Sequence, residues 1–230
     1  MCMNSTSKHL LQRGFSLTEL VAVIGTAAIL AGLLVFVLTH GNTKKPRISD
    51  QRAEAQEITC VNNLKQLGLA FRLWPSGQSD KWPMDVPVKY GGTKEFNTGA
   101  DTFRHFQVMS NELSTPRILA CPADTRVAAY NFVQFNNQNV SYFVGLDANE
   151  ISPQMFLSGD RNISGPTKPE NGILKIRPSD KVSWTAEIHN NVGNILCADG
   201  SVQPWSNAGL QKGLQDSGDS TNVWRLALPE

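Results

Sequence analysis

The sequence predicts an α+β fold in which a long N-terminal helix, first apolar and then amphipathic, packs on a small C-terminal antiparallel sheet. Three observations predict this fold. An uncharged apolar run extends from Leu20 to Leu38, apolar residues recur at helical spacing from Ile58 to Trp74, and strand-like runs separated by turn residues follow in the C-terminal half. Helical and strand periodicities in separate parts of one chain are typical of this fold class.

The apolar run is long enough to cross a membrane. At about 1.5 Å per helical residue, the run from Leu20 to Leu38 covers roughly 28 Å, close to the hydrocarbon thickness of a bilayer. An ordinary secretory signal has a shorter apolar core that precedes its cleavage site, whereas here the candidate cleavage point after Gly14 precedes the run. We therefore expect a leader at residues 1–14 and a retained transmembrane helix at residues 15–40.

A single carboxylate, that of Glu19, lies at the edge of this apolar segment. A charged group near the centre of a bilayer costs a few kcal/mol, so its position needs a reason. In one interpretation Glu19 lies in the headgroup layer. In the interpretation that we favour it pairs with a buried positive group, which cleavage after Gly14 would create as the α-amino group of Phe15, in the same molecule or in a neighbouring subunit.

The charges around the apolar segment bear on its orientation in the membrane. Two basic residues precede the segment and four follow it, the last being Arg52. By the positive-inside rule this count alone would place the C-terminal part in the cytoplasm. The leader pattern is more specific than a charge count, and we follow it in expecting a single-pass inner-membrane protein with a periplasmic C-terminal domain.

Residues 41–74 are expected to continue the N-terminal helix as an amphipathic segment. Residues 41–46 contain two helix breakers, after which Ser49 is a candidate N-cap with Asp50 in the first helical turn. One apolar stripe at steps of three and four residues then follows, and Pro75 ends the helix. The stripe consists of Ile58, Val61, Leu64, Leu67, Phe71 and Trp74.

Residues 75–230 are expected to form one globular domain. Its first part is rich in turn formers, with short helical pieces expected near Thr102–Leu113. We expect a turn at Gly159–Asn162, in which Arg161 pairs with Asp160 or with a backbone carbonyl. The predicted strands are Tyr142–Val144, Ile173–Ile176, Lys181–Ala186, and a hairpin of Asn194–Ala198 and Ser201–Trp205 around an Asp199-Gly200 turn.

Composition argues against several functional classes. A formal net charge of +1 offers no electrostatic footprint for nucleic acid. The sequence also lacks the usual nucleophile-elbow, zinc-protease, phosphate-loop and Cys-x-x-Cys motifs. Nothing in the sequence therefore points to an enzyme, and no cofactor is expected.

Cysteine usage is compatible with an exported protein. Cys2 would leave with the leader, so Cys60, Cys121 and Cys197 remain and permit at most one internal disulfide. We favour Cys60 with Cys121 and interpret Cys197, within a predicted strand, as a small buried apolar residue. Three unpaired thiols are the alternative.

Several motifs carry a family resemblance. The segment Gly14–Leu20 resembles the cleavage and methylation site of type IV prepilins and type II secretion pseudopilins. Later motifs are similar to those of a pseudopilin-like family abundant in planctomycetes and verrucomicrobia. These motifs are the helix segment Cys60–Ala70 with Asn63, the element Cys121-Pro122-Ala123-Asp124, and His189 followed after nine residues by Asp199-Gly200.

The resemblance implies a pilin-like fold and a structural role. A prepilin peptidase would cut after Gly14 and methylate the amine of Phe15, and Glu19 would guide subunit docking. The implied partners are that peptidase, other pilin or pseudopilin subunits, a secretion or pilus assembly platform, and membrane lipid. The implied product is a type II secretion pseudopilus or a type IV pilus-like filament. The alternative is a membrane-tethered periplasmic binding module that does not polymerise.

Two groups of residues are candidate ligand sites, and each also has a structural interpretation. His189 and Asp199 would suit a metal site or the acid–base pair of a tethered hydrolase, but we favour His189 bonding backbone at a turn and Asp199 shaping the next turn. Resemblance to major pseudopilins makes Asp216 and Asp219 candidate calcium ligands. Calcium takes six to eight oxygen ligands, and we favour a solvated loop at these two residues.

Overall fold

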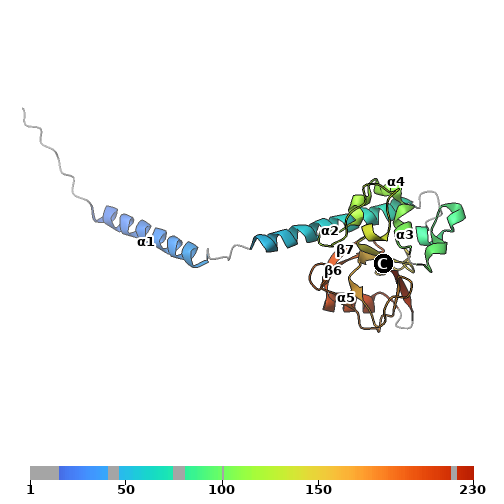
Figure 1. The fold of residues 1–230 in the computed structure, drawn as a ribbon. Coiled ribbons are helices and arrows are strands. Elements are labelled where there is room, and N and C mark those ends of the chain that lie inside the picture. The colour runs from blue at the N-terminus through green and yellow to red at the C-terminus, as the bar shows by residue number, and fades with distance from the viewer. Residues whose placement is uncertain (1–15, 41–46, 75–80, 100, 219–221) are drawn as a thin grey trace, which may run out of the picture. The chain divides into compact units, whose positions relative to one another are not determined.

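The computed structural model describes residues 16–40, 47–74, 81–99, 101–218 and 222–230 (Figure 1). It divides into two compact units, Met1–Arg47 and Ile48–Glu230. The predicted leader and the processing residues Gly14 and Phe15 lie outside the described residues. The class is α+β, as the sequence predicted, because helices precede and flank an antiparallel sheet.

The first unit contains helix α1, Leu17–His40. Among the described residues, its segment Leu17–Thr39 is the one helix long and apolar enough to cross a membrane, with a mean hydropathy of 2.8. Its polar side chains bond inside the helix, since the Thr26 hydroxyl donates to the Val23 carbonyl at 3.0 Å. Internal satisfaction of polar groups is what a hydrocarbon environment requires. A helix of this kind near the N-terminus is typical of a membrane anchor or a signal sequence.

The second unit is built on a six-stranded antiparallel sheet with the order β4-β8-β1-β2-β6-β7. A separate two-stranded sheet pairs β3 with β5. The strands are β1 Tyr142–Gly145, β2 Phe156–Asp160, β3 Ile163–Ser164, β4 Ile173–Ile176, β5 Ser183–Trp184, β6 Val192–Cys197, β7 Val202–Ser206 and β8 Trp224–Ala227. β1 and β4 confirm two predicted strands, whereas the strand predicted at Lys181–Ala186 is reduced to β5.

The β6–β7 hairpin confirms the predicted Asp199-Gly200 turn. Gly200 has a φ of +83°, which glycine adopts without steric penalty. The Asp199 carboxylate accepts a hydrogen bond from the Ser201 backbone N–H at 2.8 Å. Asp199 therefore has the turn-shaping role expected of it.

Helices occupy most of the remaining regular structure. α3 and α4 confirm the helical pieces predicted near Thr102–Leu113, whereas α5 was not predicted. The α-helices after the first are α2 Ile48–Leu73, α3 Phe103–Gln107, α4 Ser110–Leu113 and α5 Asn207–Asp216. Single 3-10 turns are η2 Pro83–Asp85, η3 Val88–Tyr90, η4 Lys94–Phe96, η5 Pro116–Leu119 and η6 Asn137–Asn139.

Helix α2 packs against β6, β7, α4 and η5. Its buried face corrects the predicted stripe, because Ile58 is 56% exposed and only Leu64, Leu67 and Phe71 of the stripe are fully buried. Ile58 lies about 200° around the helix from the buried Cys60, at 100° per residue. The helix also begins at Ile48, one residue before the candidate cap. The buried face consists of Cys60, Asn63, Leu64, Leu67, Gly68, Ala70 and Phe71.

Gly68 allows α2 to lie close to the sheet. A Cβ atom at this position would stand 2.8 Å from the Leu196 Cδ1 atom on β6, closer than carbon atoms tolerate. A larger residue at position 68 would therefore require the Leu196 side chain to shift.

The turn predicted at Gly159–Asn162 is wrong, because Gly159 and Asp160 belong to the central strand β2, in which all five residues are buried. Hydrogen bonds from neighbouring strands make the burial of its polar residues possible. The Ser158 hydroxyl donates to the Phe143 carbonyl at 2.6 Å, and the Asp160 carboxylate accepts from the Asn194 N–H at 2.7 Å. A polar strand buried on both faces shows no alternation and resembles a turn in the sequence.

A buried histidine in the second unit makes stability depend on pH. His105 is fully buried, its Nδ1 atom lies 2.8 Å from the Thr93 hydroxyl, and its Nε2 atom has no hydrogen-bond partner in the described chain. Burial lowers the pKa of His105 to about 4. Because this pKa lies below the ordinary value of 6.5, folding favours the neutral ring, and the associated stability is present above pH 6.5 and lost as the pH falls towards 4.

We expect His105→Asn to reduce the loss of stability between pH 6.5 and 4 by about 3 kcal/mol relative to the unmodified chain, at 1.4 kcal/mol per pH unit. Urea unfolding of the full chain in non-ionic detergent, followed by tryptophan fluorescence at both pH values, measures the difference. All five tryptophans lie after residue 47, so the signal reports the second unit. An identical acid sensitivity of the two proteins would contradict the assignment.

Candidate functional site at the Cys60–Cys121 disulfide

The centre of the site is a buried disulfide between Cys60 on α2 and Cys121, two residues after η5. The two Cα atoms are 5.2 Å apart, and the bond closes a sequence separation of 61 residues. Both cysteines are at most 1% exposed. The structure thus joins the pair that the sequence analysis favoured, while Cys197 is a free, buried thiol as interpreted.

Hydrogen bonds flank the disulfide on the same face of α2. Gln56, one turn before Cys60, donates from Nε2 to the Pro122 carbonyl at 2.8 Å. Asn63, about one turn after it, donates from Nδ2 to the Ala120 carbonyl at 3.3 Å. Residues spaced by three or four lie on one helix face. The helix is therefore attached on both sides of Cys121, through Asn63 and Gln56.

A charged cluster holds the segment after Cys121. The Arg161 guanidinium makes two hydrogen bonds of 2.8 Å to the Asp124 carboxylate and one of 2.8 Å to Glu187. Burial raises the pKa of Asp124, but the charge and hydrogen bonds of Arg161, together with hydrogen bonds from Ser141 and the Thr125 backbone, outweigh burial, so the pKa lies below its ordinary value. The expected pairing of Arg161 with Asp160 is wrong, because Asp124 and Glu187 surround the guanidinium.

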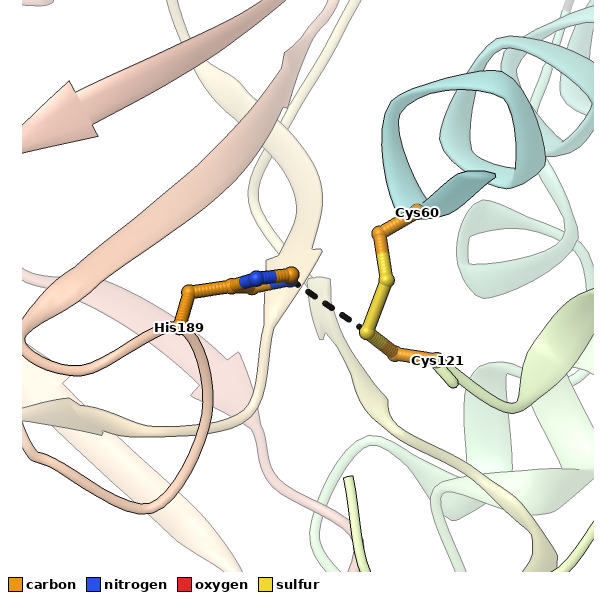
Figure 2. Close-up of side chains that lie close together, drawn as sticks. All are labelled: Cys60, Cys121 and His189. Atoms are coloured by element: carbon orange, nitrogen blue, oxygen red, sulfur yellow. Dashed lines mark hydrogen bonds between the residues drawn. A yellow bond between two sulfur atoms is a disulfide. The ribbon is translucent and has the colours of Figure 1, made fainter. Parts of the chain in front are cut away.

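His189 reaches the disulfide from the loop between β5 and β6. Its Nε2 atom lies 3.3 Å from the Cys121 Sγ atom, and its side chain is 5% exposed. Figure 2 shows the ring directed at the Cys121 sulfur, with Cys60 entering from the helix on the other side. The expectation that this ring bonds backbone is therefore replaced by a contact with sulfur.

The loop that carries His189 has an unusual backbone. His189, Asn190 and Asn191 have φ angles of 52°, 51° and 65°, so three successive non-glycine residues are left-handed. Such conformations are uncommon outside glycine and cost free energy unless surrounding contacts hold them. Asn162 supplies such contacts, because its Nδ2 group donates to the carbonyls of Thr185 at 2.8 Å and Ile188 at 2.9 Å.

Asp160 places a buried carboxylate beside this histidine. Its Oδ2 atom lies 3.8 Å from His189 Nε2 and accepts hydrogen bonds from the backbone and side chain of Asn194. Its Oδ1 atom has no hydrogen-bond partner within the described part of the chain. Burial raises the pKa of Asp160 to about 7 and lowers the pKa of His189. The carboxylate beside His189 Nε2 is thus that of Asp160 and not that of Asp199, and the charge of Glu57 also acts on His189 by raising its pKa.

Three potential metal ligands meet at this site. The Sγ atoms of Cys60 and Cys121 and a ring nitrogen of His189 all lie within 4.8 Å of one another. While the disulfide is formed, neither sulfur is a thiolate that could bind a metal. In this state the cluster connects α2, the segment after η5 and the β5–β6 loop.

The candidate calcium ligands do not form a comparable group in the described structure. Asp216 ends α5, where its carboxylate pairs with Lys212 at 3.3 Å, and Asp219 lies outside the described residues. The loop predicted at Asp216 is therefore wrong, because this residue is the last of α5.

Sequence reasoning found the two cysteines, Asn63, Pro122, Asp124 and His189 but missed the groups that support them. The Ser141 hydroxyl accepts a hydrogen bond from the Cys121 N–H at 2.9 Å. Asp160 lies beside His189, Arg161 binds Asp124, and Asn162 bonds the loop that carries His189. The segment Gly159–Asn162 drew attention as a run of small and polar residues, yet nothing in the sequence placed it against His189. No known protein family, curated protein or solved structure matches this chain.

Proposed function

We propose that the chain is a pilin-like structural subunit, anchored in the inner membrane, processed by a prepilin peptidase and assembled into a type II secretion pseudopilus or a type IV pilus-like filament. Its partners would be that peptidase, the other subunits and the assembly platform. The His189–Asp199 pair gives no reason to add a catalytic role, because the two side chains have different neighbours.

One observation carries this proposal, namely the position of Glu19. It is the sole acidic residue of α1. Its Oε2 atom accepts hydrogen bonds from the Ser16 backbone N–H at 2.9 Å and the Ser16 hydroxyl at 3.1 Å, so the carboxylate is turned back towards the start of the helix. Negative charge is favourable at that end of a helix.

Cleavage after Gly14 would complete this arrangement. The Ser16 N–H group that donates a hydrogen bond to Glu19 belongs to the peptide bond between Phe15 and Ser16. A new α-amino group on Phe15 would therefore belong to the residue that directly precedes Ser16, and we propose that it pairs with Glu19 of the same chain or of an adjacent subunit. An ammonium and a carboxylate that pair in lipid relieve the cost that each would have alone.

The disulfide supports a location outside the cytoplasm for the second unit. Disulfides persist in oxidising compartments such as the periplasm and are rare in the cytoplasm. The Cys60–Cys121 bond thus favours the orientation inferred from the leader over the one that the charge count suggests.

Co-expression with a prepilin peptidase tests the proposal. We expect intact-mass measurement of the membrane fraction to show a chain lacking residues 1–14, and the full-length chain when the peptidase is catalytically inactive. A chain that keeps its full mass with an active peptidase, while a known prepilin in the same cells is cut, would contradict the proposal and favour a tethered module that does not polymerise.

A further inference from the structure

The surroundings of the disulfide contain more polar groups than a cross-link requires. Asp160 is a fully buried carboxylate with an unpartnered oxygen, and such a group is costly without a compensating partner. His189 is held against sulfur by a strained left-handed loop. Neither residue is needed to form the bond between Cys60 and Cys121.

We propose that, when the disulfide is reduced, Cys60, Cys121, His189 and Asp160 bind one zinc ion, so that disulfide and zinc are alternative states of the same site. This inference stands independently of filament assembly, because it concerns the second unit alone.

The donor chemistry suits zinc. Two thiolates, one imidazole nitrogen and one carboxylate oxygen are the ligand types that zinc combines in four-coordinate sites. Thiolates also disfavour magnesium and calcium, which take oxygen ligands. The four residues come from α2, the segment after η5, the β5–β6 loop and β2, so a bound ion would connect four parts of the fold.

Two of the six edges of the proposed tetrahedron are already close to the required lengths. With zinc–sulfur bonds near 2.3 Å and zinc–nitrogen or zinc–oxygen bonds near 2.1 Å, the edges of a tetrahedron are about 3.6 Å between sulfur and nitrogen and about 3.4 Å between nitrogen and oxygen. The corresponding distances are 3.3 Å from Cys121 Sγ to His189 Nε2 and 3.8 Å from His189 Nε2 to Asp160 Oδ2. The sulfurs must separate to about 3.8 Å, which breaking their bond permits. The Asp160 carboxylate is not among the ligand atoms that all lie within 4.8 Å of one another, so it must move towards the sulfurs when the ion binds.

The groups behind the proposed ligands are arranged to orient them. Asn194 donates two hydrogen bonds to Asp160 Oδ2, at 2.7 Å from its backbone and 2.9 Å from its side chain. Asn162 fixes the loop behind His189 through three backbone carbonyls. Hydrogen bonds to metal ligands of this kind fix their direction and raise affinity.

The change of state balances with a dithiol as reductant. The dithiol gives two electrons and two protons and becomes a cyclic disulfide, while the Cys60–Cys121 bond breaks to give two thiols. Zinc then displaces the two thiol protons, which pass to the solvent. Reoxidation removes both thiolate ligands and must release the ion.

Zinc titration of the full chain in detergent tests this inference. The reference chain carries Cys2→Ala and Cys197→Ala, so that the proposed site holds its only thiols. After reduction with dithiothreitol and anaerobic desalting, we expect one zinc ion per chain in competition with a chromophoric chelator, and cobalt to give a thiolate-to-metal absorption band. The oxidised reference chain should take no zinc from the same chelator.

Matched variants separate ligands from bystanders. His189→Ala should weaken zinc binding by at least tenfold and Asp160→Asn by a similar factor. The control Asn190→Gly, next to His189, offers no ligand and keeps the left-handed backbone without steric penalty, so it should keep the affinity within a factor of three. A reduced reference chain that takes up no zinc, or a His189→Ala variant with unchanged affinity, would overturn the inference.

Folding of the reduced chain is checked by tryptophan fluorescence. If reduction unfolds the second unit, zinc should restore the native spectrum in the reference chain and fail to do so in His189→Ala. Failure of zinc to refold the reference chain would also overturn the inference.

Discussion

Replacing Glu19 with alanine is expected to abolish filament assembly while leaving membrane insertion and removal of residues 1–14 intact. The reason is electrostatic: without the carboxylate, the freed ammonium of Phe15 would remain unpaired in lipid, at a cost of a few kcal/mol per subunit contact. Glu19→Gln should have the same effect, because it retains a hydrogen-bond acceptor for Ser16 and loses only the charge.

Electron microscopy and cross-linking of cells that produce each variant measure this effect. Thr18→Ala is the matched control, since its hydroxyl contacts Ser16 at 2.9 Å on the same helical turn but carries no charge. Filaments at normal yield in Glu19→Ala would refute the pairing. Loss of filaments in the threonine control as well would show that the helix start is merely sensitive to substitution.

Removing the disulfide by the double substitution Cys60→Ala/Cys121→Ala is expected to lower the free energy of unfolding of the second unit by about 4 kcal/mol. This figure follows from the chain-entropy cost of releasing a loop of this length, since the two cysteines are 61 residues apart. Urea unfolding in non-ionic detergent under oxidising conditions, followed by tryptophan fluorescence, measures it.

Cys197→Ala provides the control for the loss of a buried sulfur without the loss of a bond. Cys197 is free and 3% exposed on β6, so its replacement should cost on the order of 1 kcal/mol. Equal losses in the two proteins would mean that the disulfide contributes little beyond the packing of its atoms.

The parts of the fold that could be predicted from sequence depend on local signals. The apolar run predicted α1, and the Asp199-Gly200 dipeptide predicted the β6–β7 hairpin. Short runs of residues with high strand propensity predicted β1 and β4. Each signal lies within the segment that it describes, so neighbouring residues suffice to identify it.

The parts that could not be predicted depend on partners distant in sequence. β2 lies at the centre of the sheet between β1 and β6, and its Ser158 and Asp160 are satisfied only by residues of those strands. β8 inserts between β4 and β1 although it is the last strand of the chain. Propensity and periodicity carry no information on such pairings.

The same limit explains the partial prediction of the site. The sequence placed His189 at a turn, where its ring was expected to bond backbone, whereas the left-handed turn at His189 directs the ring at Cys121 and Asp160. Arg161 likewise pairs with Asp124, 37 residues earlier, and not with its neighbour. Motif residues were thus found as a set, but their partners required the fold.

The most direct test of the central claim is N-terminal mass spectrometry of the protein purified from the cells that produce it naturally. The proposed function predicts a mature chain whose first peptide begins with N-methylated Phe15. This residue directly precedes Ser16, whose backbone N–H donates a hydrogen bond to Glu19. A mature chain that still begins with Met1, or that is cut after the apolar helix, would contradict it.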